Sequence, residues 1–138
     1  MKKNVCVIGS SYGRKVICNA LKNSGFIKDF FLKYSDNTYE DLKKKHKYIY
    51  TSLEDFILEK KINLFILAVP PKIQFEYAKK INKFKIPIIF EKPLGISTRQ
   101  VDQLKKILGK KIDSHSIDFN FLTSKPFQYL IKNYLTNN

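Results

Sequence analysis

Residues 4–13, Asn4-Val-Cys-Val-Ile-Gly-Ser-Ser-Tyr-Gly13, join a short apolar run to a turn bounded by two glycines. A continuous apolar run of this length is typical of a strand buried on both faces of a parallel sheet. After the turn, apolar residues recur at helical spacing, at Val16, Ile17, Ala20 and Leu21. The stretch therefore predicts a strand, a tight turn and a helix, which is the repeating unit of an α/β fold.

The same alternation of strands and helices continues to the end of the chain. Strands are expected at 4–8, 28–34, 48–50, 64–69, 87–90 and 112–121. Helices are expected near 16–23, 37–47, 52–60, 75–84, 97–109 and 127–135. Strands that alternate with helices form parallel sheets with right-handed crossovers. We therefore expect a single Rossmann-like α/β domain over residues 1–138, with a doubly wound, mostly parallel sheet of about six strands and helices on both faces.

The net charge of +14 on 138 residues raises the question of a nucleic-acid partner. Among the 26 basic residues only Arg14 and Arg99 are arginine, and the other basic residues are lysine. Proteins that bind nucleic acids favour the planar guanidinium for bases and phosphates. Several lysine pairs also fall at expected helix ends, where cations stabilise the helix dipole. The charge therefore predicts a solvated basic surface, and nucleic acid is an unfavoured partner.

Cysteine, histidine and hydropathy patterns exclude several other classes. Cys6 and Cys18 lie in apolar segments without a Cys-x-x-Cys motif, and the histidines are His46 and His115. We therefore expect buried thiols in a reducing compartment and no metal site. No apolar run approaches the roughly 18–20 residues of a membrane span, and the N-terminus lacks the pattern of a signal peptide. A cytoplasmic protein without membrane contact is expected.

In open α/β sheets, ligands bind at the carboxyl ends of the strands, and the first such place here is the turn after residues 4–8. The turn contains Gly9, Ser10, Ser11, Tyr12, Gly13 and Arg14. The dinucleotide fingerprint is G-x-G-x-x-G; Gly9 fits it, Ser11 takes the place of the second glycine, and Gly13 comes one residue early. Serine hydroxyls and the Arg14 charge suit a phosphate, but a plain glycine-containing turn explains the same residues.

The residues that follow the strands expected at 28–34 and 64–69 do not decide between NAD and NADP. After the second strand, Asp36 would favour the ribose of NAD, whereas Ser35 and the nearby lysines would favour NADP. Asp36 followed by Asn37 is also an ordinary turn signal. After residues 64–69, Pro70 and Pro71 predict a rigid loop that ends the strand.

A charged motif, Glu91-Lys-Pro-Leu94, follows the strand expected at 87–90. Pro93 restricts Lys92 to extended geometry and so limits the direction of its ammonium group. A lysine at this edge can hydrogen-bond a substrate hydroxyl or carbonyl and stabilise developing charge. The alternative is a salt bridge at the rim.

In order along the chain, these motifs resemble the Gfo/Idh/MocA (glucose–fructose oxidoreductase-like) family. The resemblance covers nearly the whole chain and rests on five segments: Val5–Gly9 with Gly13, Ser52–Phe56, Asn63–Pro71, Glu91–Leu94, and Ile117–Phe121 followed by Pro126-Phe-Gln128. It implies an NAD(P)-dependent oxidoreductase, with NAD or NADP undecided, acting on a sugar, sugar nucleotide or related cyclic alcohol.

The resemblance also implies roles for individual residues. It assigns Gly9, Ser10, Ser11, Tyr12 and Gly13 to the pyrophosphate, beside Arg14; Ser35 and Asp36 to the adenosine ribose; Val69, Pro70 and Pro71 to the border of the dinucleotide; and Glu91, Lys92 and Pro93 to the nicotinamide and substrate. Lys92 is the implied catalytic residue.

Three features depart from the family pattern. The glycine turn is altered at Ser11 and shortened, and Gln74 stands where the family often has histidine. The sequence ends at Asn138, so the family's C-terminal substrate domain is expected to be absent, and His115 does not match its catalytic histidine. We therefore expect dinucleotide binding with weak or no activity by residues 1–138 alone. The alternatives are a non-enzymatic nucleotide-binding module that contacts a protein partner or a second copy and, less favoured, a basic nucleic-acid binder.

Overall fold

A computed structural model of the chain describes residues 3–23, 27–32, 49–50, 52–109, 115–118 and 125. Six strands form one sheet: β1 (Lys3–Ile8), β2 (Ile27–Leu32), β3 (Ile49–Tyr50), β4 (Leu64–Leu67), β5 (Ile88–Glu91) and β6 (Ser116–Asp118). Their order is β3-β2-β1-β4-β5-β6, and every neighbouring pair is parallel. This is the doubly wound Rossmann order, which confirms the predicted fold.

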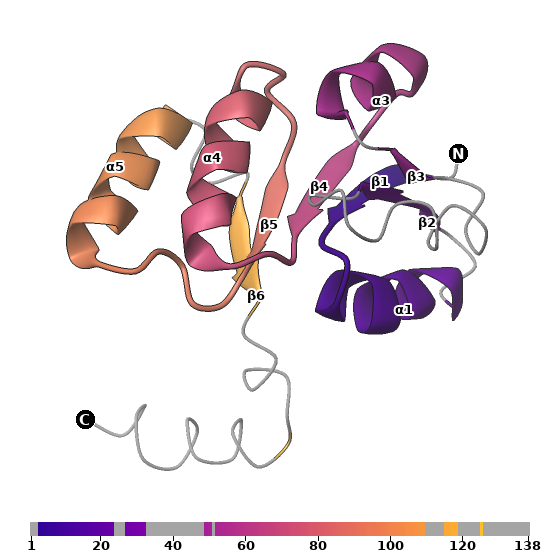
Figure 1. Cartoon of the computed structure of the whole chain (residues 1–138), viewed down its shortest axis with the longest axis horizontal. Coiled ribbons are helices and arrows are strands. Elements are labelled where there is room, and N and C mark those ends of the chain that lie inside the picture. The colour runs from indigo at the N-terminus through magenta and orange to yellow at the C-terminus, as the bar shows by residue number, and fades with distance from the viewer. Residues whose placement is uncertain are drawn as a thin grey trace.

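The helices lie on both faces of the sheet (Figure 1). On one face, α3 (Leu53–Glu59), α4 (Pro71–Asn82) and α5 (Thr98–Leu108) pack on a core that includes Phe56, Phe65, Ile81 and Phe90. On the other face, α1 (Cys18–Asn23) packs on Val5, Val7 and Ile66. Strand residues alternate between the two cores because successive side chains of a strand point to opposite faces.

Local sequence signals set the ends of α5. The Ser97 hydroxyl accepts a hydrogen bond from the Gln100 backbone N–H at 3.3 Å, so Ser97 is the N-cap of the helix. Gly109 ends the helix with a φ of 60°, in the left-handed region that glycine tolerates without steric cost.

Three differences from the sequence prediction bear on the site. Pro71, expected within a rigid loop, is the first residue of α4, because a proline at this position loses no helical hydrogen bond. Glu91, expected just after its strand, is the last residue of β5 and pairs in register with Asp118 of β6. The helix after the glycine turn begins as a π-helix over Gly13–Ile17, where the Cys18 N–H donates to the Gly13 carbonyl.

Several predictions fall outside the described residues. They include the ribose candidates Ser35 and Asp36, the helix expected at 37–47 and the amphipathic helix expected at 127–135. In the part of the chain that is described, no helix is long and apolar enough to cross a membrane. The same part contains no cluster of histidine, cysteine and acidic residues that could hold a metal ion.

Candidate cofactor site

A cleft opens at the carboxyl ends of β1, β4 and β5. Its volume is about 310 Å³, and its lining residues are Ser11, Tyr12, Ala68, Val69, Pro70, Glu91 and Lys92. In the sheet order, β1 and β4 are the neighbours between which the chain changes direction. Ligands of open α/β sheets bind at this switch point, so the cleft is the candidate cofactor site.

Gly9 occupies a position where a larger residue would not fit. Its φ is 144°, and a Cβ there would overlap the Ala68 carbonyl oxygen and lie 2.9 Å from the carbonyl carbon. The Ala68 N–H donates to the Ile8 carbonyl at 2.8 Å, which holds the end of β4 against the turn. Gly9 therefore lets the first turn cross closely over the end of β4.

Gly13 brings the following helix onto the sheet. A Cβ at this buried position would lie 3.0 Å from both the Ala68 Cβ and the Val7 Cγ1. The last glycine of the dinucleotide fingerprint has this packing role, and Gly13 performs it one residue early. The π-helix that starts at Gly13 contains one more residue in its turn than an α-helix. Cys18, which follows this π-helix, is buried.

The remaining residues of the turn surround the start of this helix. Ser11 accepts the first helical hydrogen bond through its carbonyl, from the Lys15 N–H at 2.9 Å, and its side chain is exposed at the cleft. Arg14 donates from Nε to the Ser10 carbonyl at 3.2 Å, which holds the guanidinium beside the turn. Helix N-termini attract phosphate through their free N–H groups and dipole, so the turn offers both charge and N–H donors to a pyrophosphate.

Gln74 of α4 joins the two loops that border the cleft. Its side chain is 1% exposed, and Nε2 donates to the Val69 carbonyl at 3.0 Å and to the Glu91 carbonyl at 2.8 Å. The Oε1 atom of Gln74 is buried and has no hydrogen-bond partner. This one carboxamide therefore fixes the spacing between the end of β4 and the end of β5.

Glu91 and Lys92 form the end of the cleft on the β5 side. Glu91 is 9% exposed, and its Oε1 is buried without a partner. Burial raises the pKa of the Glu91 carboxyl, and the charge and hydrogen bond of Asp118 raise it further. The exposed Lys92 follows it, joined to Pro93 by a cis peptide bond. Glu91 and Lys92 therefore line one end of the cleft, and Asp118 lies in register with Glu91 on the neighbouring strand β6.

A family model described as an oxidoreductase family with an NAD-binding Rossmann fold matches residues 3–119. The chain belongs to the Gfo/Idh/MocA family. Among curated proteins, no sequence matches the chain. Solved structures with the same fold include a myo-inositol dehydrogenase from Corynebacterium glutamicum, with 14% identity and a TM-score of 0.79 over 100% of this chain.

Two further neighbours show the same fold in complexes with a cofactor and a second ligand. The WlbA dehydrogenase from Bordetella pertussis, in complex with NADH and UDP-GlcNAcA, has 13% identity and a TM-score of 0.78 over 96% of this chain. A biliverdin reductase from Synechocystis, in complex with biliverdin and NADP⁺, has 14% identity and a TM-score of 0.74 over 94% of the chain. The chain spans between 41 and 43% of the length of these three neighbours.

Most candidates that the Gfo/Idh/MocA resemblance selected lie together at one edge of the sheet. Ser11, Tyr12, Val69, Pro70, Glu91 and Lys92 line the cleft, with Gly9, Ser10, Gly13 and Arg14 in the adjoining turn. Pro71 begins α4 behind the cleft, and Pro93 follows Lys92. Asp118 was missed as a site residue because its position opposite Glu91 depends on the register of β5 and β6.

His115 lies at the amino end of β5, whereas Lys92 follows its carboxyl end. Its Nδ1 accepts a hydrogen bond from the Ile88 N–H at 3.0 Å, and its ring packs edge-on against Phe90 at 6.4 Å between centroids. Burial lowers the pKa of this imidazole. His115 therefore supports the amino end of β5 as a neutral acceptor.

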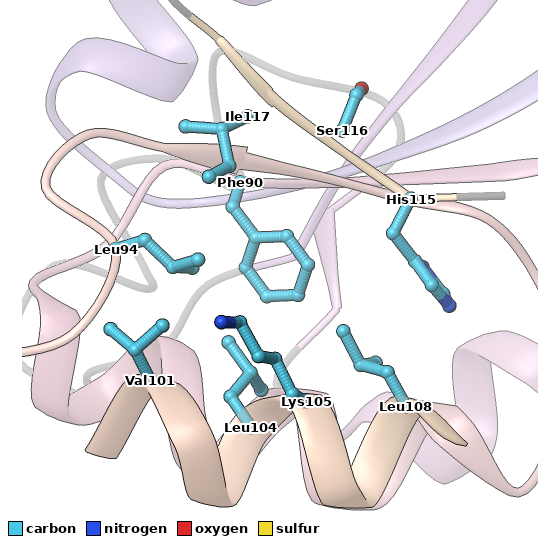
Figure 2. A pocket seen from close by; sticks show the side chains of 9 residues that line it. All are labelled: Phe90, Leu94, Val101, Leu104, Lys105, Leu108, His115, Ser116 and Ile117. Atoms are coloured by element: carbon cyan, nitrogen blue, oxygen red, sulfur yellow. The ribbon is translucent and has the colours of Figure 1, made fainter. Parts of the chain in front are cut away.

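A second hollow of about 350 Å³ lies between α5 and strands β5 and β6, outside the cofactor cleft. Figure 2 shows Phe90 and Ile117 pointing from the strands toward Val101, Leu104 and Leu108 of α5. The groove is apolar, and no motif in the sequence pointed to it.

Proposed function

We propose that the cleft binds NAD(P) across the β1–β4 switch point and that Lys92 orients and polarises the oxygen of a sugar-like alcohol or ketone. The observation that carries this proposal is that one cleft joins the glycine turn, at Ser11 and Tyr12, to Glu91 and Lys92. Neither half would suffice alone, because a pyrophosphate site binds many nucleotides and a rim lysine binds many anions.

The sheet order gives the direction of the dinucleotide. In Rossmann folds the pyrophosphate sits on the first turn, and the adenosine ribose meets a residue after β2. Because β2 and β4 lie on opposite sides of β1, the nicotinamide half extends toward the ends of β4 and β5. This direction brings the nicotinamide to the side of the cleft that contains Lys92.

When bound, the dinucleotide supplies or accepts the hydride. Lys92 donates a hydrogen bond to the substrate oxygen and stabilises its negative charge as that charge develops. Gln74 holds the Val69 and Glu91 carbonyls, which keeps the two walls of the cleft at the spacing that the cofactor needs.

The substrate class is a proposal taken from the neighbours. Their ligands and names include myo-inositol and UDP-GlcNAcA, although biliverdin reductase shows that the fold also serves other compounds. We expect little turnover from residues 1–138 alone, because Lys92 is the one residue we assign to substrate binding.

Thermal-shift titration tests the cofactor proposal, with NAD⁺, NADH, NADP⁺ and NADPH as ligands and ADP as control. A dinucleotide at about a hundred times its Kd should stabilise the chain by about 2.7 kcal/mol, and the preferred pair decides between NAD and NADP. The absence of a shift with every dinucleotide would contradict the proposal and favour the partner-module alternative.

Ser11→Glu sharpens this test. It places a carboxylate beside the expected pyrophosphate, and we expect at least tenfold weaker dinucleotide binding, which corresponds to about 1.4 kcal/mol. Thr98→Glu is the matched control, because Thr98 is also exposed but lies at the start of α5, where a carboxylate suits the helix dipole. Equal affinities of the two variants would place the pyrophosphate elsewhere.

A further inference from the structure

The two carboxyl groups at the end of the cleft are placed together by the sheet itself. Glu91 is the last residue of β5 and lies in register with Asp118, the last residue of β6. Neighbouring strands are roughly 4.8 Å apart, and residues in register project to the same face. The charge of Asp118 and a hydrogen bond from it raise the pKa of the Glu91 carboxyl, and two carboxyl groups can hydrogen-bond each other only when one of them is protonated.

The environment of Glu91 favours a retained proton. Glu91 is 9% exposed, and one of its carboxyl oxygens has no partner in the fold. Two carboxylates in one site do not both ionise easily, and burial penalises the charged form. Glu91 therefore retains its proton to higher pH than an exposed glutamate does.

The charges around this pair come from a small set of described residues. Asp118 faces Glu91 from β6, and the Lys92 ammonium and backbone N–H lower the pKa of Glu91 from the other side. From α4 comes the uncharged carboxamide of Gln74, which binds the Glu91 backbone oxygen. Across the cleft, the turn after β1 presents Ser11 and Tyr12.

Glu91 lies on the side of the sheet that faces the expected nicotinamide. Along β5, Phe90 packs into the core under α5 and Ile89 packs into the core under α1. Alternation places Glu91 on the α1 side with Ile89, the side on which the glycine turn lies. The Glu91 side chain therefore borders the cleft that we assign to the dinucleotide.

We propose that the Glu91–Asp118 pair couples the oxidation state of the bound nicotinamide to a proton, releasing the proton when the oxidised cofactor binds and retaining it with the reduced one. This inference rests on the proposed function. The oxidised nicotinamide ring carries a positive charge that the reduced ring lacks, and Lys92 adds another positive charge nearby. Ionisation of the pair, by loss of its O–H proton to solvent, supplies a compensating negative charge.

The test is the pH dependence of binding by the full chain. Kd values for the oxidised and reduced forms of the preferred dinucleotide are measured from about pH 4, near the ordinary glutamate pKa, to about pH 8. We expect the preference for the oxidised form to rise by about fivefold or more with pH, at the lower end of the usual coupling between sites. Loss of the same bound proton should appear as loss of the infrared C=O band of a protonated carboxyl when the oxidised form binds.

Variants identify the groups responsible. Glu91→Gln and Asp118→Asn should each flatten the pH dependence of the preference. Asp102→Asn should leave it unchanged, because it removes the same charge from an exposed carboxylate on α5 that pairs with Lys105. If Glu91→Gln fails to fold, the infrared measurement on the wild-type chain and the pH dependence of Asp118→Asn still test the proposal.

The outcomes separate the two proposals. A wild-type preference that does not change with pH, alongside tight binding of both forms, would overturn the coupling and leave the proposed function intact. A pH dependence that survives in Glu91→Gln and Asp118→Asn would also overturn the assignment to this pair. Failure of the wild-type chain to bind any dinucleotide at any pH would overturn both.

Discussion

The polar groups at the two edges of the sheet differ in their hydrogen bonding. The amino edge is formed by the amino ends of the parallel strands, and the carboxyl edge by their carboxyl ends. At the amino edge, Asn4 and Asn63 exchange hydrogen bonds, the Asn4 carboxamide reaches the Lys61 carbonyl, and His115 accepts from the Ile88 N–H. At the carboxyl edge, Gln74 and Glu91 each keep one buried oxygen without a partner. Both edges belong to the same strands, so strand formation alone does not explain the difference.

The difference shows which edge is built for a ligand. An unpartnered buried oxygen costs about 1–3 kcal/mol, and buried polar groups are normally satisfied. Within the described residues, the two orphaned oxygens lie on residues at or directly behind the cleft. Among the described residues, the amino edge therefore has no buried side-chain oxygen or nitrogen without a partner, whereas the carboxyl edge gives up stability at the place where we expect the cofactor.

The largest expected effect is a loss of stability on adding a Cβ at Gly9, where the turn after β1 passes close to the end of β4. Gly9→Ala should destabilise the domain by about 3 kcal/mol or more, because backbone strain adds to overlap with the Ala68 carbonyl. Urea unfolding measures the effect. Gly109→Ala is the control, since its φ of 60° is also strained but no atom lies within 4 Å of the added Cβ. A similar loss in both variants would show that strain, and not the approach to β4, governs Gly9.

A smaller effect should follow from separating the cleft walls. Gln74→Leu leaves the Val69 and Glu91 carbonyls without their buried donor, at a cost of about 1–3 kcal/mol, and we expect about tenfold weaker dinucleotide binding. Asn82→Leu on the same helix is the control, because it removes the 2.6 Å bond from Asn82 Nδ2 to the Ile107 carbonyl, away from the cleft. Equal losses of affinity in both variants would show that Gln74 does not position the walls of the cleft.

The smallest effects concern pH, and they should have opposite signs at the two edges. Burial and then Asp118 raise the pKa of Glu91, so its contribution to stability is present below the ordinary pKa of about 4.3 and is lost as the pH rises through the folded value. Burial lowers the pKa of His115, so its contribution is present above about 6.5 and is lost as the pH falls through the folded value.

Urea midpoints measured against pH test this difference between the edges. Glu91→Gln should flatten the decline in stability toward neutral and alkaline pH, and should leave the acid side unchanged. His115→Gln should flatten the acid side, because glutamine offers an oxygen to the Ile88 N–H without titrating in this range. A variant that changes both sides equally would indicate general destabilisation instead of a titrating group.

Much of the fold was predictable because it depends on local signals. The apolar run before Gly9, the Ser97 cap and the Gly109 stop each act over a few neighbouring residues. Pro71 was expected in a loop because proline breaks strands, yet proline also fits the first turn of a helix. Pro71 is helical here because the residues of α4 that follow it pack on the sheet.

The candidate site was predictable in part. Parallel strands bring their carboxyl ends to one edge, so the motifs after β1, β4 and β5 were expected to meet there. The partners of Gln74 and the pairing of Glu91 with Asp118 were not predictable, because both join segments far apart in the sequence. No local sequence pattern predicts either of these two contacts.

The amino-acid sequence by itself determined the alternation of strands and helices, the glycine turn and the place of Lys92 at a strand end. These features follow from hydrophobic period and backbone preference, which are properties of short segments. The tertiary structure alone decided which polar groups are buried and left unpaired, why Gly9 must lack a Cβ, and which carboxyl group faces Glu91. Burial, close approach and strand register exist only after distant segments have packed together.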